Sequence, residues 1–244
     1  MDLELAVADP ELQTDNLAPQ YSQLCGILAG FAFVGFSIYL AADKLPPQAP
    51  NVAASLFAGF VTLILLAVLY TLMAADKSSY RVATGLYVYG LPFGLGSITL
   101  FYTLTLMALA HPALHATVQI GRIFVLVIGP AIVMSRLNGG ALMLKGGVRS
   151  RILPRRLGLV LVCLLVAAGL TLLIWPGVMS SLDGQGVVPA YIALGSACVA
   201  GGLSPLIAQR SADSTLHRIS IDIYLLVGFV ALLASTCIAA AVLR

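Results

Sequence analysis

Three polar residues near the middle of the chain, His115, Gln119 and Arg122, are the strongest candidates for chemistry. Their spacing of four and then three residues places them on one face of a helix. The uncharged run after Arg122 ends at Ser135 and covers only about 20 Å at about 1.5 Å per residue. This is too short to cross the roughly 30 Å hydrocarbon core of a bilayer. If the segment crosses a membrane, Arg122 must therefore enter it.

A charged helix face is costly in lipid, so we expect it to point toward the protein interior or toward water. The preceding apolar run contains Thr99, Tyr102, Thr103 and Thr105 at a similar depth. Together these residues predict a polar, outward-facing vestibule with Arg122 as its cationic floor. Such a site suits an anion that carries a carboxylate or a phosphate. In the alternative interpretation, Arg122 extends to the outer interface and only anchors its helix.

Asp222 is the one acidic residue placed to enter the membrane. We expect it about one turn from the inner end of the last apolar run, whereas Arg122 lies in the outer half of its own run. Their different depths make a direct salt bridge improbable. Asp222 is either a proton or cation site, or a charge near a helix N-terminus, where the helix dipole favours it.

Several classes of enzyme are disfavoured by what the sequence lacks. It contains no HExxH, GxSxG or P-loop motif and no paired-acid motif such as DxxxD. Its histidines are His111, His115 and His217, and the last is expected on the opposite side of the membrane from the others. Each cysteine lies in an apolar run, outside any CxxC pair. We therefore expect no metal, no cofactor and no disulfide framework, and we lean against an enzyme.

The composition identifies the solvent in which the chain folds. Of its 244 residues, 60% are hydrophobic and 9% are charged, whereas a soluble domain has roughly 25% charged residues. Its mean hydropathy is +1.01. These values exclude a disordered chain and an ordinary cytosolic enzyme, and nothing suggests a nucleic acid partner. The fold class predicted is an all-α, polytopic integral membrane protein.

Seven apolar runs are long enough to cross a bilayer as helices. They leave short loops and no room for a soluble domain. The runs cover residues 21–42, 52–75, 82–110, 115–136, 157–178, 187–208 and 220–243. We accordingly predict a single seven-helix domain over residues 21–243, preceded by an acidic segment, 1–20.

The distribution of basic residues predicts the orientation. The segment 137–156 has no acidic residue and is expected to be a cytoplasmic loop. Its basic residues are Lys145, Arg149, Arg151, Arg155 and Arg156. Alternation then places the N-terminus in the cytoplasm and the C-terminus outside, in a bacterial-type plasma membrane. These charges either bind anionic lipids or serve only to fix the topology.

The sequence leaves three functional hypotheses. Helices interrupted by glycine and proline, together with the Arg122 face, favour a small-solute transporter or channel-like protein with an outward-facing cationic site. The scarcity of polar groups and a small-residue face at Gly26 and Gly30 favour a non-catalytic partner or sensor subunit, or a homo-oligomer. A lipid-modifying membrane enzyme ranks third, because no nucleophile–base pair is evident.

Overall fold

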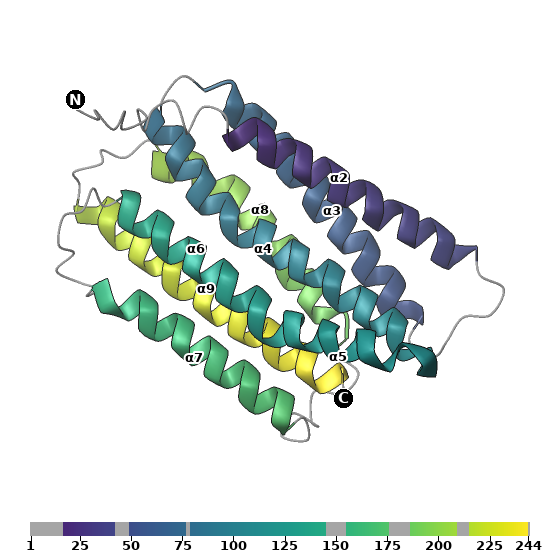
Figure 1. Ribbon diagram of the computed structural model, residues 1–244. Coiled ribbons are helices and arrows are strands. Elements are labelled where there is room, and N and C mark those ends of the chain that lie inside the picture. Colours follow the sequence, from purple (N-terminus) through teal and green to yellow (C-terminus); the bar gives the residue numbers. More distant parts are fainter. Residues whose placement is uncertain are drawn as a thin grey trace, which may run out of the picture.

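The computed structural model of the protein is built from helices (Figure 1). The structure describes residues 17–41, 49–76, 79–144, 155–175, 186–208 and 215–243. Most of the acidic segment 1–20 lies outside these ranges, although Leu17–Gln20 already belong to the first helix. Every regular element in the described ranges is helical, which confirms the predicted all-α class.

The helices follow the predicted apolar runs closely. Two short elements interrupt the path between α4 and α6: a 3-10 turn, Pro112–Leu114, and a π-helical segment, Phe124–Ile128. The α-helices are α2 (Leu17–Leu40), α3 (Ala49–Ala74), α4 (Ser79–Leu109), α5 (His115–Ile123), α6 (Gly129–Leu144), α7 (Arg155–Ile174), α8 (Val188–Ala208) and α9 (Thr215–Val242). Because α5, the π-helical segment and α6 form one continuous rod, the described ranges contain seven helical passes.

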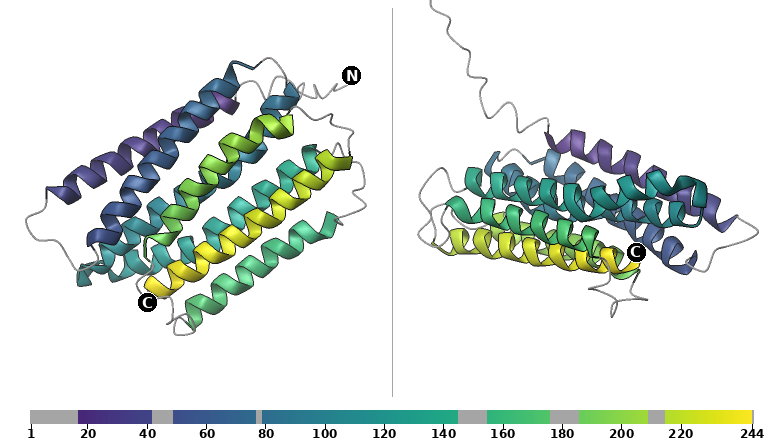
Figure 2. Two further views of the ribbon diagram at one scale, coloured as in Figure 1. Left: turned by 180° about the vertical axis from the view of Figure 1, so that it is seen from behind. Right: turned by 60° about the horizontal axis from the view of Figure 1, so that its bottom comes forward.

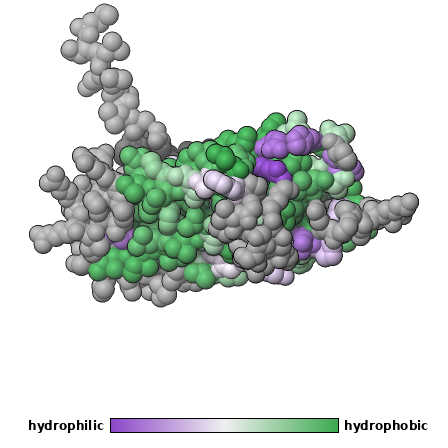
Figure 3. Space-filling view, turned by 90° about the horizontal axis from the view of Figure 1, so that it is seen from below, coloured by the Kyte–Doolittle hydropathy of each residue, from purple (hydrophilic) through white to green (hydrophobic). Residues whose placement is uncertain are grey.

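The lengths and surfaces of these helices match a bilayer. Five of the described passes are long and apolar enough to cross a membrane, and shorter apolar stretches cover Gly158–Ile174 of α7 and Val188–Gly201 of α8. Large apolar side chains point outward, and Phe31 and Trp175 are each 70% exposed. Hydrophobic residues cover most of the described surface in Figure 3. Water would penalise such a surface, whereas lipid accepts it, and helices satisfy their own backbone groups there.

Helix α4 lies at the centre of the bundle. It packs against α3, α8 and the α5–α6 rod, while α2 and α7 lie at opposite edges (Figures 1 and 2). We call the end at which α2 begins the N-side, and the end at which α9 finishes the C-side. The rod begins on the C-side and ends on the N-side, so its first turns carry Arg122 near the C-side of α4.

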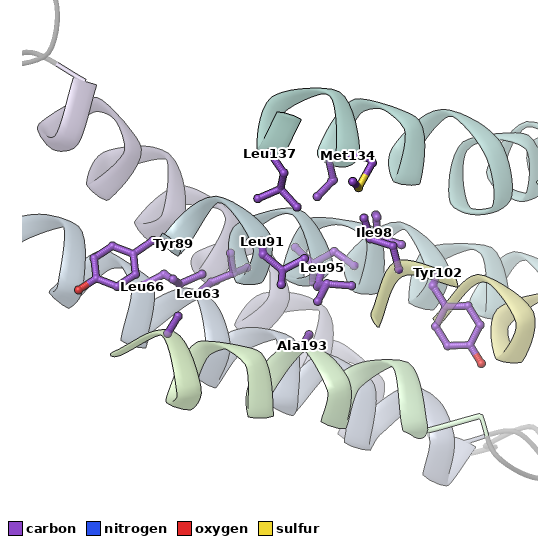
Figure 4. Packing of buried hydrophobic residues seen from close by; sticks show 14 of the residues in the cluster. Leu63, Leu66, Tyr89, Leu91, Leu95, Ile98, Tyr102, Met134, Leu137 and Ala193 are labelled. Atoms are coloured by element: carbon purple, nitrogen blue, oxygen red, sulfur yellow. The ribbon is translucent and has the colours of Figure 1, made fainter. Parts of the chain in front are cut away.

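Large aliphatic side chains fill the space around α4. Met134 and Leu137 of α6 point toward α4 from one side, and Leu63 and Leu66 come from α3 (Figure 4). Small residues allow the backbones to approach, as is common between helices in membranes. A Cβ added at Gly94 of α4, for example, would lie 2.3 Å from Val133 Cγ2 of α6.

The segment expected to form the loop 137–156 is helical at both ends. Helix α6 continues to Leu144 and α7 begins at Arg155. The extension is stabilised because Leu137 and Ala141 are buried and Gly140 packs on the Tyr87 ring. Lys145, Arg149 and Arg151 lie outside the described residues.

The orientation of the bundle stays a prediction, which cysteine labelling tests. In a variant without native cysteines, Asp183→Cys should react with an impermeant thiol reagent added outside the cell. Ser150→Cys should react only after the membrane is opened, because the basic segment should be cytoplasmic. The reverse labelling pattern would contradict this orientation.

Candidate functional site

Arg122 lies in the last turn of α5, immediately before the helix changes to π-helical geometry. Helix α5 packs closely on α4 here: a Cβ added at Gly121 would lie 2.1 Å from Thr105 Oγ1. The Arg122 side chain is half-buried. Its Nε is shielded from solvent and has no hydrogen-bond partner in the described part of the chain, a condition shared by the hydroxyls of Tyr39 and Ser55. A buried donor without an acceptor is costly, so this position favours an external acceptor.

Gln119 and His115 lie one and two turns before Arg122 along α5. Gln119 Nε2 is 3.5 Å from His115 Nε2, so the predicted shared face exists for these two side chains. His115 is exposed, whereas Gln119 and Arg122 are half-buried. The three residues therefore form a line that becomes less exposed toward Arg122. We call this line the α5 polar line.

The π-helical segment has an identifiable cause in the sequence. Pro130 has no N–H to donate to the carbonyl of Leu126, four residues earlier. The Gly129 N–H reaches back five residues to the Phe124 carbonyl, which widens the turn. Gly169 of α7 then approaches the Leu126 carbonyl so closely that an added Cβ would lie 2.1 Å from that oxygen. The irregular backbone after Arg122 is thus held by α7.

Tyr102, the fourth residue of the predicted site, is engaged elsewhere. Its side chain is fully buried, and its hydroxyl donates to the Gly186 carbonyl at 2.9 Å. This bond ties α4 to the start of α8. Since a phenol has one proton to donate, Tyr102 has none left for an anion beside Arg122.

Two of the α4 threonines satisfy their own hydroxyls within the helix. Thr103 Oγ1 donates to the Thr99 carbonyl and Thr105 Oγ1 to the Phe101 carbonyl, each at 2.7 Å. Such bonds to the preceding turn are a common solution for hydroxyls in an apolar environment. Among the α4 residues expected near Arg122, Thr105 lies against Gly121, the residue that precedes Arg122.

Asp222 is buried in α9 near the N-side, with 3% of its side chain exposed. The preceding residue, Ile221, accepts a hydrogen bond from the Tyr87 hydroxyl at 3.0 Å through its carbonyl. The depth of Asp222 matches Tyr87 on α4, whereas Arg122 lies near Thr105. Tyr87 and Thr105 are 18 residues apart on α4, which corresponds to about 27 Å along the helix at about 1.5 Å per residue. The Asp222 carboxylate and the Arg122 guanidinium therefore do not belong to one site. A proton or cation role for Asp222 stays a prediction.

Two tyrosine hydrogen bonds join α4 and α9 beside Asp222, and we call this pair the clasp. Tyr87 donates to the Ile221 carbonyl, and Tyr224 of α9 donates to the Val88 carbonyl of α4. Their rings meet edge to face with centroids 5.4 Å apart. The clasp fixes the position of the only buried carboxylate in the described ranges.

The double variant Tyr87→Phe, Tyr224→Phe should lower the free energy of unfolding by about 1–3 kcal/mol, since each cross-helix hydrogen bond contributes about 0.5–1.5 kcal/mol. Unfolding in detergent with increasing denaturant measures the loss. Tyr191→Phe is the control, because Tyr191 is 61% exposed. An unchanged double variant would show that the clasp contributes nothing to stability.

One polar contact could not be found from the sequence. Arg136 Nη1 of α6 donates to the Tyr21 hydroxyl of α2, and the guanidinium lies 5.8 Å from the centre of the Tyr21 ring. Arg136 and Tyr21 are far apart in the sequence and belong to no common motif. They meet only because the folded helices bring them together.

The described ranges contain no group of three or more His, Cys, Asp or Glu side chains arranged to hold a metal ion. The helices and the apolar surface define an integral membrane protein of the all-α class. Comparison with protein-family models, curated proteins and solved structures finds no match to this chain.

Proposed function

We propose that the protein is a small-solute transporter or channel-like protein that binds an anion at Arg122. The observation that carries this proposal is the buried Arg122 Nε, which has no hydrogen-bond partner among the described residues. Guanidinium remains charged at any physiological pH and offers only donors. A carboxylate or phosphate would supply both the missing acceptor and the compensating charge.

The surroundings of Arg122 support movement of a solute rather than permanent structural pairing. The α5 polar line leads from the exposed His115 to Arg122. The backbone beyond it is π-helical, and irregular helices in membrane proteins are typical of binding and transport segments.

Flux into liposomes tests the proposal. The purified protein should be reconstituted in phosphatidylcholine liposomes, and uptake of labelled lactate, inorganic phosphate and chloride compared with protein-free liposomes. We expect saturable uptake of at least one anion. Labelled glycerol and rubidium are the charge controls and should stay at the protein-free rate. Uptake of glycerol or rubidium without any anion, or no uptake at all, would contradict an anion site.

A second candidate is a non-catalytic partner subunit, which the exposed face of α2 favours. A Cβ added at Gly26 or at Gly30 would have no heavy atom within 4 Å, so this small-residue face has no partner within the described chain. In membranes such faces often contact another helix. If the protein instead co-purifies with another membrane protein and shows no flux, this candidate is favoured.

A further inference from the structure

In the N-side contact between Arg136 and Tyr21, most of the guanidinium N–H donors of Arg136 are left for a further ligand. Among the described residues, Arg136 makes one hydrogen bond, through Nη1 to Tyr21. A guanidinium has five N–H donors. The ion pair seen in the described ranges joins Arg81 to Asp76, so no described carboxylate neutralises Arg136. Its side chain is exposed.

A set of stacked rings holds this guanidinium in place. Tyr21 stacks on Tyr70 with centroids 5.4 Å apart and meets Phe93 edge to face at the same distance. Tyr70 in turn meets Tyr89 edge to face at 5.5 Å. Because the rings come from α2, α3 and α4, the position of the Tyr21 hydroxyl is fixed by three helices. Arg136, from α6, is thereby oriented rather than free to move with solvent.

An outward-facing strip of α4 begins beside these residues and runs toward the C-side. It consists of Gly90, Ser97, Phe101 and Leu104, which recur on one helix face. Phe101 is 43% and Leu104 is 57% exposed, and a Cβ added at Gly90 would have no heavy atom within 4 Å. The Ser97 hydroxyl donates to the Phe93 carbonyl, so the strip presents no unsatisfied donor to lipid. We call it the α4 strip.

The dimensions of the strip fit an acyl chain. The α4 strip is about 21 Å long at about 1.5 Å per residue, which exceeds half of the roughly 30 Å hydrocarbon core. Arg136 lies at its N-side end, two turns before α6 finishes at Leu144. Tyr21 lies one turn after α2 begins at Leu17. Both residues thus lie near helix ends, where lipid phosphates are found and where tyrosine and arginine are favoured.

We propose that Arg136 and Tyr21 bind the phosphate of one anionic phospholipid whose acyl chain lies along the α4 strip. The uncompensated guanidinium supplies the charge complementarity, and its remaining donors match phosphate oxygens. The open position at Gly90 leaves space for the glycerol region and the first carbons of the chain. Its phosphate-binding residues lie at the N-side, away from Arg122, so the proposal does not depend on the proposed function. Only the C-side end of the strip comes near the Arg122 segment, where the Phe101 ring contacts the Phe124 ring with centroids 4.1 Å apart.

Native mass spectrometry of the purified protein in a neutral detergent tests the proposal. The protein should be titrated with dioleoylphosphatidylglycerol, and with dioleoylphosphatidylcholine as the uncharged comparison. The parent should retain one phosphatidylglycerol more tightly than the others. Arg136→Gln should weaken that lipid at least about tenfold, as expected for lost charge-assisted hydrogen bonds. Arg136→Lys should lie between the two, because it keeps the charge and loses the planar fork.

Two further variants separate this site from general attraction to basic residues. Arg81→Gln removes another exposed arginine at the N-side and should leave the tightest lipid bound as in the parent. Gly90→Leu places a side chain in the strip and leaves residue 136 as arginine, so it should weaken binding of the tightest phosphatidylglycerol by a factor similar to that of Arg136→Gln. Gly90→Ala adds only a methyl group and should change this affinity little. If Arg136→Gln fails to fold, this glycine pair still decides the question. A parental affinity in both Arg136→Gln and Gly90→Leu, or an equal loss in Arg81→Gln, would overturn the proposal.

Inorganic phosphate distinguishes a lipid from a soluble ligand. Because the acyl chain contributes to binding, millimolar phosphate should leave the bound phosphatidylglycerol in place. If phosphate alone displaces the lipid completely, the site recognises a free anion and the lipid assignment is wrong.

Discussion

Gly169→Ala should be among the most destabilising single-methyl additions in this protein, lowering the free energy of unfolding by about 2–3 kcal/mol. The added Cβ would lie 2.1 Å from the Leu126 carbonyl oxygen. A backbone oxygen cannot rotate away as a side chain can, so α7 must separate from the π-helical segment. Denaturant unfolding in detergent, followed by circular dichroism, measures the loss.

Two other glycines provide matched controls for Gly169. A Cβ added at Gly195 of α8 has no heavy atom within 4 Å, so Gly195→Ala should be neutral or slightly stabilising, because alanine favours helices. A Cβ added at Gly158 of α7 would lie 1.8 Å from Asn138 Oδ1, a side-chain atom that is able to move. Gly158→Ala should therefore fall between the two. Equal stability of the Gly169 and Gly195 variants would show that the close contact of α7 with the π-helical segment is wrong.

Arg122→Gln should abolish anion uptake in reconstituted liposomes while the protein still folds and inserts. The glutamine keeps a polar side chain of moderate length but loses the charge that an anion requires. Folding is checked by helicity and by monodisperse elution, so that uptake is expressed per folded molecule. Normal uptake by a folded Arg122→Gln variant would exclude Arg122 as the binding group.

The neighbours on the α5 polar line should give smaller defects of the same kind. His115→Ala and Gln119→Ala should each reduce uptake by about two- to tenfold, since they remove polar groups along the approach and leave the cation in place. Leu126→Ala, which removes a buried side chain, should lower stability by about 2–4 kcal/mol without selective loss of uptake per folded molecule. If the alanine variants at 115 and 119 match the parent, the polar line is not part of the pathway.

The positions of the helices could be predicted because the bilayer imposes a length on each apolar run. The predicted run 187–208 and the observed α8, Val188–Ala208, agree almost residue for residue. The bounds of the fourth apolar run, 115–136, are harder to predict, because the charge of Arg122 interrupts the run. There the chain combines α5, a π-helical segment and α6, and the rod continues past the predicted end at residue 136 to Leu144.

The candidate site was only partly predictable. Local spacing placed His115, Gln119 and Arg122 on one face, because helical periodicity is a local property. The direction of Tyr102 depended on where α8 begins, since its hydroxyl meets the Gly186 carbonyl. The Arg136–Tyr21 contact likewise depends on the packing of α2, α4 and α6. Sequence periodicity contains no information about such pairings between distant helices.

The most direct test of the anion site at Arg122 compares uptake per folded molecule in Arg122→Lys and Arg122→Gln. If Arg122 grips an anion, the lysine variant should retain part of the parental uptake and the glutamine variant none. Lysine keeps the positive charge but lacks the planar fork that binds a carboxylate or phosphate with two hydrogen bonds. If Arg122 only anchors its helix at the interface, lysine should substitute fully and glutamine should affect insertion rather than uptake. Near-parental uptake in both variants would contradict the proposed site.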